Sequence, residues 1–291
     1  MNFWRDKITP FSGNTSLHCG NNVLNFGKPL VMGILNLTPD SFFDGGRYTG
    51  KEAWLSQAEK MIYEGASIID LGAVSTRPGS REVGEEEEIS RLLPVVEQLT
   101  QRFPETVFSV DTFRAKVAKL AADAGAGLIN DISGGNMDDN LFETVAKTGL
   151  PYILMHMQGI PATMQKSPVY EDIVAEINQF FDQKLTALKE AEIRQVILDP
   201  GFGFGKTIEH NFAMLRRISE FKKPGFPVLA GISRKSMIYK LLEITPEESL
   251  SSTSALNIIA ILNGTDILRV HDVKEAVQVI RMAEAYLSYE R

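Results

Sequence analysis

The residues whose side chains could best bind a ligand or take part in catalysis directly follow short apolar runs in this sequence. Asp111, Asn130 and Asp199 each occupy such a position. Carboxylates and an amide offer the acceptors and paired donors that suit the edge of a planar heterocycle. The sequence therefore suggests a site for a flat, hydrogen-bonding ring.

A second group of residues near the ends of apolar runs carries positive charge. Its members are Arg77, Lys235, Arg269 and His271. Such side chains could stabilise an anionic leaving group. The chain has no HExxH, CxxC or GxSxG pattern, and we find no obvious covalent nucleophile. Direct displacement is therefore the favoured chemistry.

These residues can meet only if the fold gathers the ends of the apolar runs. Eight runs rich in Val, Ile or Leu occur after residue 28, namely Leu30–Leu35, Ser67–Leu71, Thr106–Val110, Gly127–Ile129, Tyr152–Met155, Gln195–Leu198, Pro227–Gly231 and Asp266–Arg269. Each is typical of a buried parallel strand, and amphipathic helical patterns separate them. Eight strand–helix units predict an α/β fold, a single (β/α)₈ TIM barrel, whose strand ends converge on one face.

The first residues do not fit this repeat. Thr15–Cys19 and Val23–Phe26, separated by Gly20-Asn21-Asn22, predict a β-hairpin that covers the bottom of the barrel. We therefore divide the chain into an extension with a capping hairpin, 1–29, and a catalytic barrel, 30–291.

The composition is that of an ordinary globular protein. The 291 residues include 44% hydrophobic ones, and the net charge of −7 gives no support to nucleic-acid binding. One cysteine excludes an intrachain disulfide, and there is no long apolar run that would predict a membrane span. We expect a cytoplasmic enzyme.

The glycine-rich stretch Gly201–Thr207 imitates a phosphate loop without being one. Only three residues separate Gly201 from Gly205, and a dinucleotide fingerprint needs a third glycine where Lys206 stands. We interpret the glycines as a mobile loop that brings Phe202 or Phe204 to a ligand.

Several polar residues have simpler interpretations. We expect Glu85–Glu88 to form a solvated first helical turn, Asp70 to make a core hydrogen bond, and His210 to lie on the surface of a helix. His156 could equally satisfy buried backbone or serve the site.

Together the motifs resemble dihydropteroate synthases. The stretches that carry the resemblance are Met32–Phe42, Ser75–Gly79, Ser109–Thr112, Ile129–Ile132, Leu154–Gly159, Leu198–Lys206, Ser233–Met237 and Arg269–Val273. They extend from Leu30 to about Ala283, and the combination is far more specific than any one piece.

The resemblance implies the condensation of 6-hydroxymethyl-7,8-dihydropterin diphosphate with 4-aminobenzoate, with Mg²⁺ as cofactor, in an enzyme that dimerises with itself. It implies that the pterin is bound by Asp111, Asn130, Met155, Asp199, Lys235 and Arg269, and the diphosphate by Asn36, Arg77, Arg269 and His271, with Asn36 on the metal. For the aminobenzoate it implies Thr76, Pro78, Phe204, Lys235 and Ser236. The mechanism that the resemblance implies begins with loss of diphosphate, after which the aniline nitrogen attacks.

Catalytic roles are implied for Asp44, Arg77, Lys235, Arg269 and His271, with Asp44 ordering a lid that shields the cation from water. The chain departs from the family at Phe43, where a small residue is common, and at Val74, where many members carry Glu. Phe43 leaves the details of lid closure open.

Two other functions would suit a related barrel. A pterin-dependent methyltransferase would share the pterin residues but lack Arg77, the Ser233–Ser236 stretch and Arg269-Val-His271, all of which are present. A non-catalytic pterin-binding barrel would have lost Asn36, Arg77 or His271, and none is lost.

Overall fold

Strands and helices alternate along the chain in the structure, a computed structural model that describes residues 16–37, 50–74, 83–159, 164 and 168–289. The strands after the N-terminal segment are β3 (Leu30–Asn36), β4 (Ile68–Gly72), β5 (Val107–Asp111), β6 (Leu128–Asp131), β7 (Tyr152–Met155), β8 (Val196–Asp199), β9 (Leu229–Ala230) and β10 (Ile267–Val270). Each of the eight predicted runs overlaps one of these strands.

Helices follow the strands, as predicted. They are α2 (Gly50–Glu64), α3 (Glu85–Arg102), α4 (Ala115–Asp123), α5 (Leu141–Thr148), α6 (Ile173–Glu190), α7 (Ile208–Arg216), α8 (Ser236–Tyr239), α9 (Leu250–Leu262) and α10 (Val273–Ser288), with short 3₁₀ turns at Ile218–Phe221 and Glu247–Ser249. In the part of the chain that the structure describes, none of these helices combines the length and apolar character needed to cross a bilayer.

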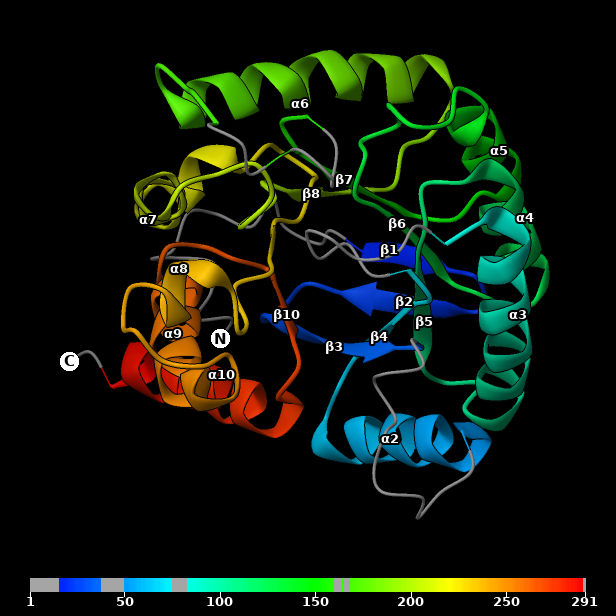
Figure 1. Ribbon diagram of the computed structural model, residues 1–291, viewed down its shortest axis with the longest axis horizontal. Helices are drawn as coiled ribbons and strands as arrows, with labels where there is room; N and C mark the ends of the chain where they lie inside the picture. The colour runs from blue at the N-terminus through cyan, green and yellow to red at the C-terminus, as the bar shows by residue number, and fades with distance from the viewer. Residues whose placement is uncertain (1–15, 38–49, 75–82, 160–163, 165–167, 290–291) are drawn as a thin grey trace.

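The eight strands form one parallel sheet in the order β8-β7-β6-β5-β4-β3-β10-β9. A parallel bridge between Leu198 and Val228, with the Leu198 N–H donating to Pro227 O at 2.8 Å, brings the two ends of that sheet together. The helices surround it (Figure 1). The (β/α)₈ barrel expected from the sequence is confirmed.

Helix ends follow local capping chemistry. Asp172 begins α6 by accepting hydrogen bonds from the N–H groups of Val174 and Ala175. Thr207 and His210 form a reciprocal capping box at the start of α7. His210 lies in a helix, as expected, but it is half-buried and its ring also caps that helix.

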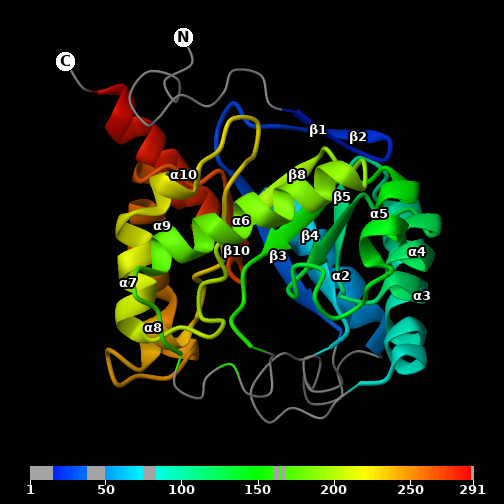
Figure 2. The same ribbon diagram turned by 90° about the horizontal axis from the view of Figure 1, so that it is seen from above.

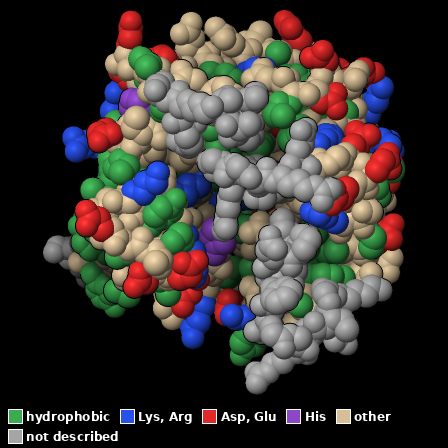
Figure 3. All heavy atoms as spheres, viewed as in Figure 1, with side chains coloured by type: hydrophobic (Ala, Val, Ile, Leu, Met, Phe, Trp, Pro, Cys, Tyr) green, Lys and Arg blue, Asp and Glu red, His purple; other side chains and the backbone are tan. Residues whose placement is uncertain are grey.

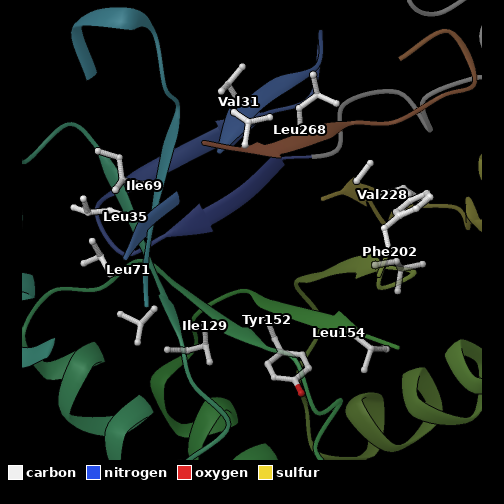
Figure 4. Packing of buried hydrophobic residues seen from close by; sticks show 14 of the residues in the cluster. Val31, Leu35, Ile69, Leu71, Ile129, Tyr152, Leu154, Phe202, Val228 and Leu268 are labelled. Carbon is white, nitrogen blue, oxygen red and sulfur yellow. The ribbon is translucent and has the colours of Figure 1, made fainter. Parts of the chain in front are cut away.

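Apolar side chains fill the layer between the strands and the helices. Figure 4 shows members of this layer, including Val31, Leu35, Ile69, Leu71 and Leu154. They pack with buried residues of α2 such as Trp54, Ala58 and Met61, which recur at helical spacing and so lie on one face of that helix.

A second, smaller apolar cluster lies where the strands begin. β1 (Ser16–Cys19) and β2 (Asn22–Asn25) form an antiparallel hairpin, with Gly20 in the left-handed turn at φ 61°. The cluster combines hairpin residues with one or two residues from each barrel strand: Leu17, Cys19, Leu24, Phe26, Leu30, Met32, Ile68, Val107, Leu128, Ile153, Ile197, Leu229 and Ile267. Figure 2 places the hairpin at one end of the barrel. The division of the chain at residue 29 stays a prediction.

Candidate active site

The side chains that point into the barrel change from apolar to polar along the strands. One residue near the start of each strand belongs to the apolar cluster under the hairpin. Because strand side chains alternate with a period of two, the residue two positions later also points into the barrel. These pairs are Ile68 and Asp70, Val107 and Ser109, Leu128 and Asn130, Ile153 and Met155, Ile197 and Asp199, and Ile267 and Arg269. A largely polar layer therefore lies above an apolar one.

Arg269 joins four strands within that polar layer. Its Nε donates to Asp70 Oδ2 at 2.7 Å, and its Nη2 donates to Asp111 Oδ2 at 3.2 Å. Asn130 Nδ2 donates to the same Asp70 oxygen at 2.9 Å. Residues from β4, β5, β6 and β10 thus meet at one point, as the sequence predicted for Asp111, Asn130 and Arg269.

Burial shapes the protonation of these groups. Burial, followed by the negative charge of Asp70, raises the pKa of Asp111 to about 7, although Arg269 opposes the shift. Burial also raises the pKa of Asp199, against the charge of Lys235. Burial alone would lower the pKa of Arg269, but Asp70 and Asp111 outweigh it and raise that pKa. The Arg269 guanidinium therefore stays charged beside Asp111, a carboxyl group whose pKa lies near neutral pH.

Lys235 lies over the loop that follows β8. Its Nζ donates to the Phe202 carbonyl and lies 4.6 Å from the centre of the Phe204 ring. Burial lowers the pKa of Lys235 to about 7, against the charge of Asp199. Phe202 is fully buried and Phe204 only partly. Phe204 is therefore the aromatic side chain available to a ligand.

Two hydrogen-bonded pairs fasten the loops after β9 and β10 to each other. Ser233 Oγ accepts the His271 N–H at 3.2 Å and lies 3.1 Å from His271 Nδ1. Arg234 donates to both carboxylate oxygens of Asp272, at 2.6 and 3.0 Å. The loop that carries Lys235 and leads into Ser236 is thereby held to the loop that follows Arg269 and carries His271. In Figure 3, Lys, Arg and His side chains lie near the middle of the face seen in Figure 1.

Asn36 stands at the exposed end of β3 on the same side of the sheet. A Cβ placed on Gly72 would lie 3.7 Å from Asn36 Oδ1 and 3.9 Å from Asp111 Oδ2. The missing side chain at Gly72 therefore leaves Asn36 and Asp111 facing common space. Met155 is buried at the end of β7, where the strand meets this layer.

Four predicted residues lie outside the described ranges. They are Asp44, Thr76, Arg77 and Pro78, together with the departure at Phe43. The remaining predicted residues all lie at the carboxyl ends of barrel strands or in the loops that follow.

Known proteins share this sequence and fold. The family model described as pterin binding enzyme matches residues 32–271. The dihydropteroate synthase of Escherichia coli K12 is 48% identical over 267 residues, which cover 91% of this chain and 94% of that protein. The chain belongs to the dihydropteroate synthase family.

Solved structures of dihydropteroate synthases agree with this membership. The Yersinia pestis dihydropteroate synthase in a sulfonamide drug complex superimposes with a TM-score of 0.88 at 46% identity, covering 94% of this chain and 99% of that one. The Xanthomonas albilineans dihydropteroate synthase in complex with 7,8-dihydropteroate gives a TM-score of 0.84 at 36% identity, covering 93% and 98%.

Sequence reasoning missed contacts that shape this dihydropteroate synthase fold. Asp70 does make a core hydrogen bond, as expected, but its partners Arg269 and Asn130 belong to the site. Glu88 is buried and pairs with Arg114, so the interpretation of Glu85–Glu88 as a solvated turn is wrong at its last residue. Helical spacing could have predicted the burial of Glu88, though not its partner, because Glu88 precedes buried Leu92 by one turn.

Proposed function

We propose that this chain joins 6-hydroxymethyl-7,8-dihydropterin diphosphate to 4-aminobenzoate, releasing 7,8-dihydropteroate and pyrophosphate. The observation that carries the proposal is the convergence of Asp111, Asn130, Arg269 and Asp70 in one polar layer above an apolar barrel floor. Few ligands suit so many in-plane donors and acceptors as well as a fused, polar heterocycle.

The pterin ring would bind through its edge and its faces. Asp111, Asn130 and Asp199 would meet the ring N–H groups, and Lys235 would donate to a ring oxygen or nitrogen. Met155 would pack against one face, and the Arg269 guanidinium would stack on the other. A carboxyl pKa near 7 lets Asp111 either donate to or accept from the ring.

The diphosphate would be held by Asn36, Arg77, Arg269 and His271. Asn36 presents an exposed amide oxygen, a hard ligand suited to Mg²⁺. The described ranges hold no group of three His, Cys, Asp or Glu side chains that could cage a metal. That arrangement fits Mg²⁺, which keeps waters and substrate phosphates as ligands. When bound, the ion would neutralise charge on the diphosphate.

The aminobenzoate would lie against Thr76, Pro78 and Phe204, with its carboxylate near Ser236 and Lys235. Ser236 begins α8 directly after Lys235, so a carboxylate there would meet a hydroxyl and an ammonium group. The aromatic ring of the substrate would pack on the Phe204 ring.

The reaction would proceed by ionisation and then capture. The bond between the pterin methylene and the diphosphate oxygen breaks, and both electrons leave with the diphosphate. Arg77, Arg269 and His271 stabilise that developing charge, while Asp44 helps to close the site against water. The neutral aniline nitrogen forms the new C–N bond and then loses a proton.

A homodimer is part of this proposal. Ile259 of α9 and Met282 and Tyr286 of α10 are exposed by 41%, 63% and 62% although they are large and apolar. α9 and α10 are neighbours on one side of the barrel (Figure 1). An exposed apolar surface of this kind suits a self-complementary contact. Light scattering should give twice the monomer mass, and Met282→Glu should reduce it. The cytoplasmic location stays a prediction.

The test of the activity is a coupled assay. Purified protein with the pterin diphosphate, Mg²⁺ and 4-aminobenzoate should release pyrophosphate and form 7,8-dihydropteroate in equal amounts. Omission of 4-aminobenzoate should reduce both products. Binding of the pterin diphosphate without any product would instead indicate a non-catalytic pterin-binding barrel.

A further inference from the structure

Lys206 is a buried lysine that the proposed reaction does not use, and burial lowers the pKa of its amine to about 7. It ends the loop that follows β8, and only 3% of its surface is exposed. Among the described residues, no carboxylate forms an ion pair with it. Burial of an ammonium group is costly unless its donors are satisfied. The contacts of Lys206 must therefore compensate for its burial.

The contacts of Lys206 Nζ lie within its own loop and across to the segment that follows β7. It donates to Phe204 O at 2.9 Å, within its own loop, and to His156 O at 3.2 Å, after β7. It also lies 3.2 Å from His156 Nδ1. The three hydrogens of an ammonium group match these three acceptors. Lys206 thus fastens the loop after β8 to the end of β7.

The two loops are pressed together at the glycines of the β8 loop. A Cβ on Gly201 would lie 2.0 Å from His156 O, and one on Gly205 would lie 2.7 Å from Gln158 O. Both glycines also have positive φ, at 71° and 60°. Close approach of backbone explains these glycines, so the loop has a defined path set by its neighbour.

That path decides where the Phe204 ring lies. The Lys206 ammonium holds the carbonyl of Phe204 itself, two residues away. Lys235 Nζ donates to the Phe202 carbonyl in the same loop and lies over the Phe204 ring. Two lysines therefore bind carbonyls of this loop, one at Phe202 and one at Phe204.

We propose that Lys206 is a positioning residue that sets the Phe204 ring as a wall of the aminobenzoate site. The inference rests on the function proposed above, and it concerns one substrate only. Lys206 makes no hydrogen bond to Asp111 or Asn130 in the described structure, and it acts on the pterin side only as a charge near Asp199 and Lys235, so its loss should affect the pterin less than the aminobenzoate. His156, directly after β7, supplies the acceptors for Lys206 outside its own loop.

The test is a comparison of KM values in Lys206→Met. The variant keeps the length of the side chain and removes its donors. The KM for 4-aminobenzoate should rise about tenfold, while the KM for the pterin diphosphate changes by less than about twofold. Lys147→Met, an exposed lysine of α5, is the matched control and should leave both values unchanged.

A double-mutant cycle with Phe204→Ala shows whether Lys206 acts through the ring. If it does, Lys206→Met should add little to the KM for 4-aminobenzoate once Phe204 is alanine. Equal increases in both KM values, or full additivity with Phe204→Ala, would overturn the proposal.

A milder variant protects the test against misfolding. Lys206→Gln keeps an N–H donor and should show the same selectivity for 4-aminobenzoate with a smaller increase. Unchanged KM values in a folded Lys206→Gln would count against the proposal. Failure of the wild-type protein to release pyrophosphate would instead refute the proposed function, whatever the variants do.

Discussion

The two ends of the barrel interior differ although the same strands build both. Under the hairpin, Ile197 and Ile267 belong to a closed apolar cluster. Two residues further along the same strands, Asp199 and Arg269 belong to the polar layer. The apolar end consists of groups that stabilise a fold by leaving water. The polar end consists of groups that are costly to bury.

This contrast indicates that the apolar end of the barrel stabilises the fold, whereas the polar end serves function. Asp111 has a pKa raised to about 7 and Lys235 a pKa lowered to about 7, in both cases chiefly by burial. Such shifts mean that the folded protein disfavours the charged forms. The polar end therefore costs stability, which the apolar end and the outer layer must offset.

The largest expected effect is on activity at the polar end. Asp111→Asn should lower kcat/KM for the pterin diphosphate about a thousandfold, because a carboxylate–ring contact is lost. The free energy of unfolding at pH 8 should stay equal or rise, since a disfavoured buried charge is removed. Steady-state kinetics and urea unfolding measure the two quantities. A large loss of stability with little loss of turnover would mean that Asp111 stabilises the fold and does not bind the substrate.

The next effect is on stability at the apolar end. Ile197→Ala should reduce the free energy of unfolding by about 2–5 kcal/mol, because it leaves a cavity in a fully packed cluster. Its kcat and both KM values should remain near those of the wild type. Asp199→Asn, two residues along the same strand, is the matched comparison and should show the opposite pattern. Loss of activity in Ile197→Ala at constant stability would contradict the view that the apolar end supplies stability and the polar end supplies activity.

Asp70 belongs to the polar layer but contacts Arg269 and Asn130 and has no role assigned on the ligand, so its replacement should have an intermediate effect. Asp70→Asn should lower kcat/KM about 10- to 100-fold, because a neutral amide with one acceptor oxygen replaces the carboxylate that holds Arg269 and Asn130 in position. Asp131→Asn is an equally buried control on β6, whose carboxylate bonds to Tyr152 Oη at 2.5 Å instead. Equal losses of activity in both variants would mean that burial, and not positioning, explains Asp70.

The smallest expected effect is a pH dependence of stability. The folded pKa of Asp111 lies near 7, above the usual value of the unfolded chain, so the folded state binds more protons between about pH 4 and 7. The contribution of Asp111 is therefore present below pH 4 and is lost as the pH rises to 7. The stability advantage of Asp111→Asn over the wild type should grow across that window and then level off. A constant difference from pH 4 to 8 would contradict the raised pKa.

Much of this architecture was predictable from the sequence. Short runs such as Tyr152–Met155 carry a period and composition that indicate buried parallel strands, and the structure places β7 at that range. The polar residues that follow such runs converge because parallel strands end on one face. Asp111, Asn130 and Arg269 meet for that reason.

The missed contacts depend on long-range geometry. Lys206 and His156 are fifty residues apart, and only the neighbouring positions of β7 and β8 bring them together. Glu88 and Arg114 meet across α3 and the loop after β5. Sequence spacing carries no signal for which buried charge pairs with which, because those pairs depend on side-chain directions in the folded barrel.

The most direct test of the central claim is a crystal structure of the protein with the pterin diphosphate and Mg²⁺. The ring should lie in the polar layer with its edge on Asp111, Asn130 and Asp199 and the Arg269 guanidinium over its face. A ring bound elsewhere on the protein, with those four side chains uninvolved, would contradict the account.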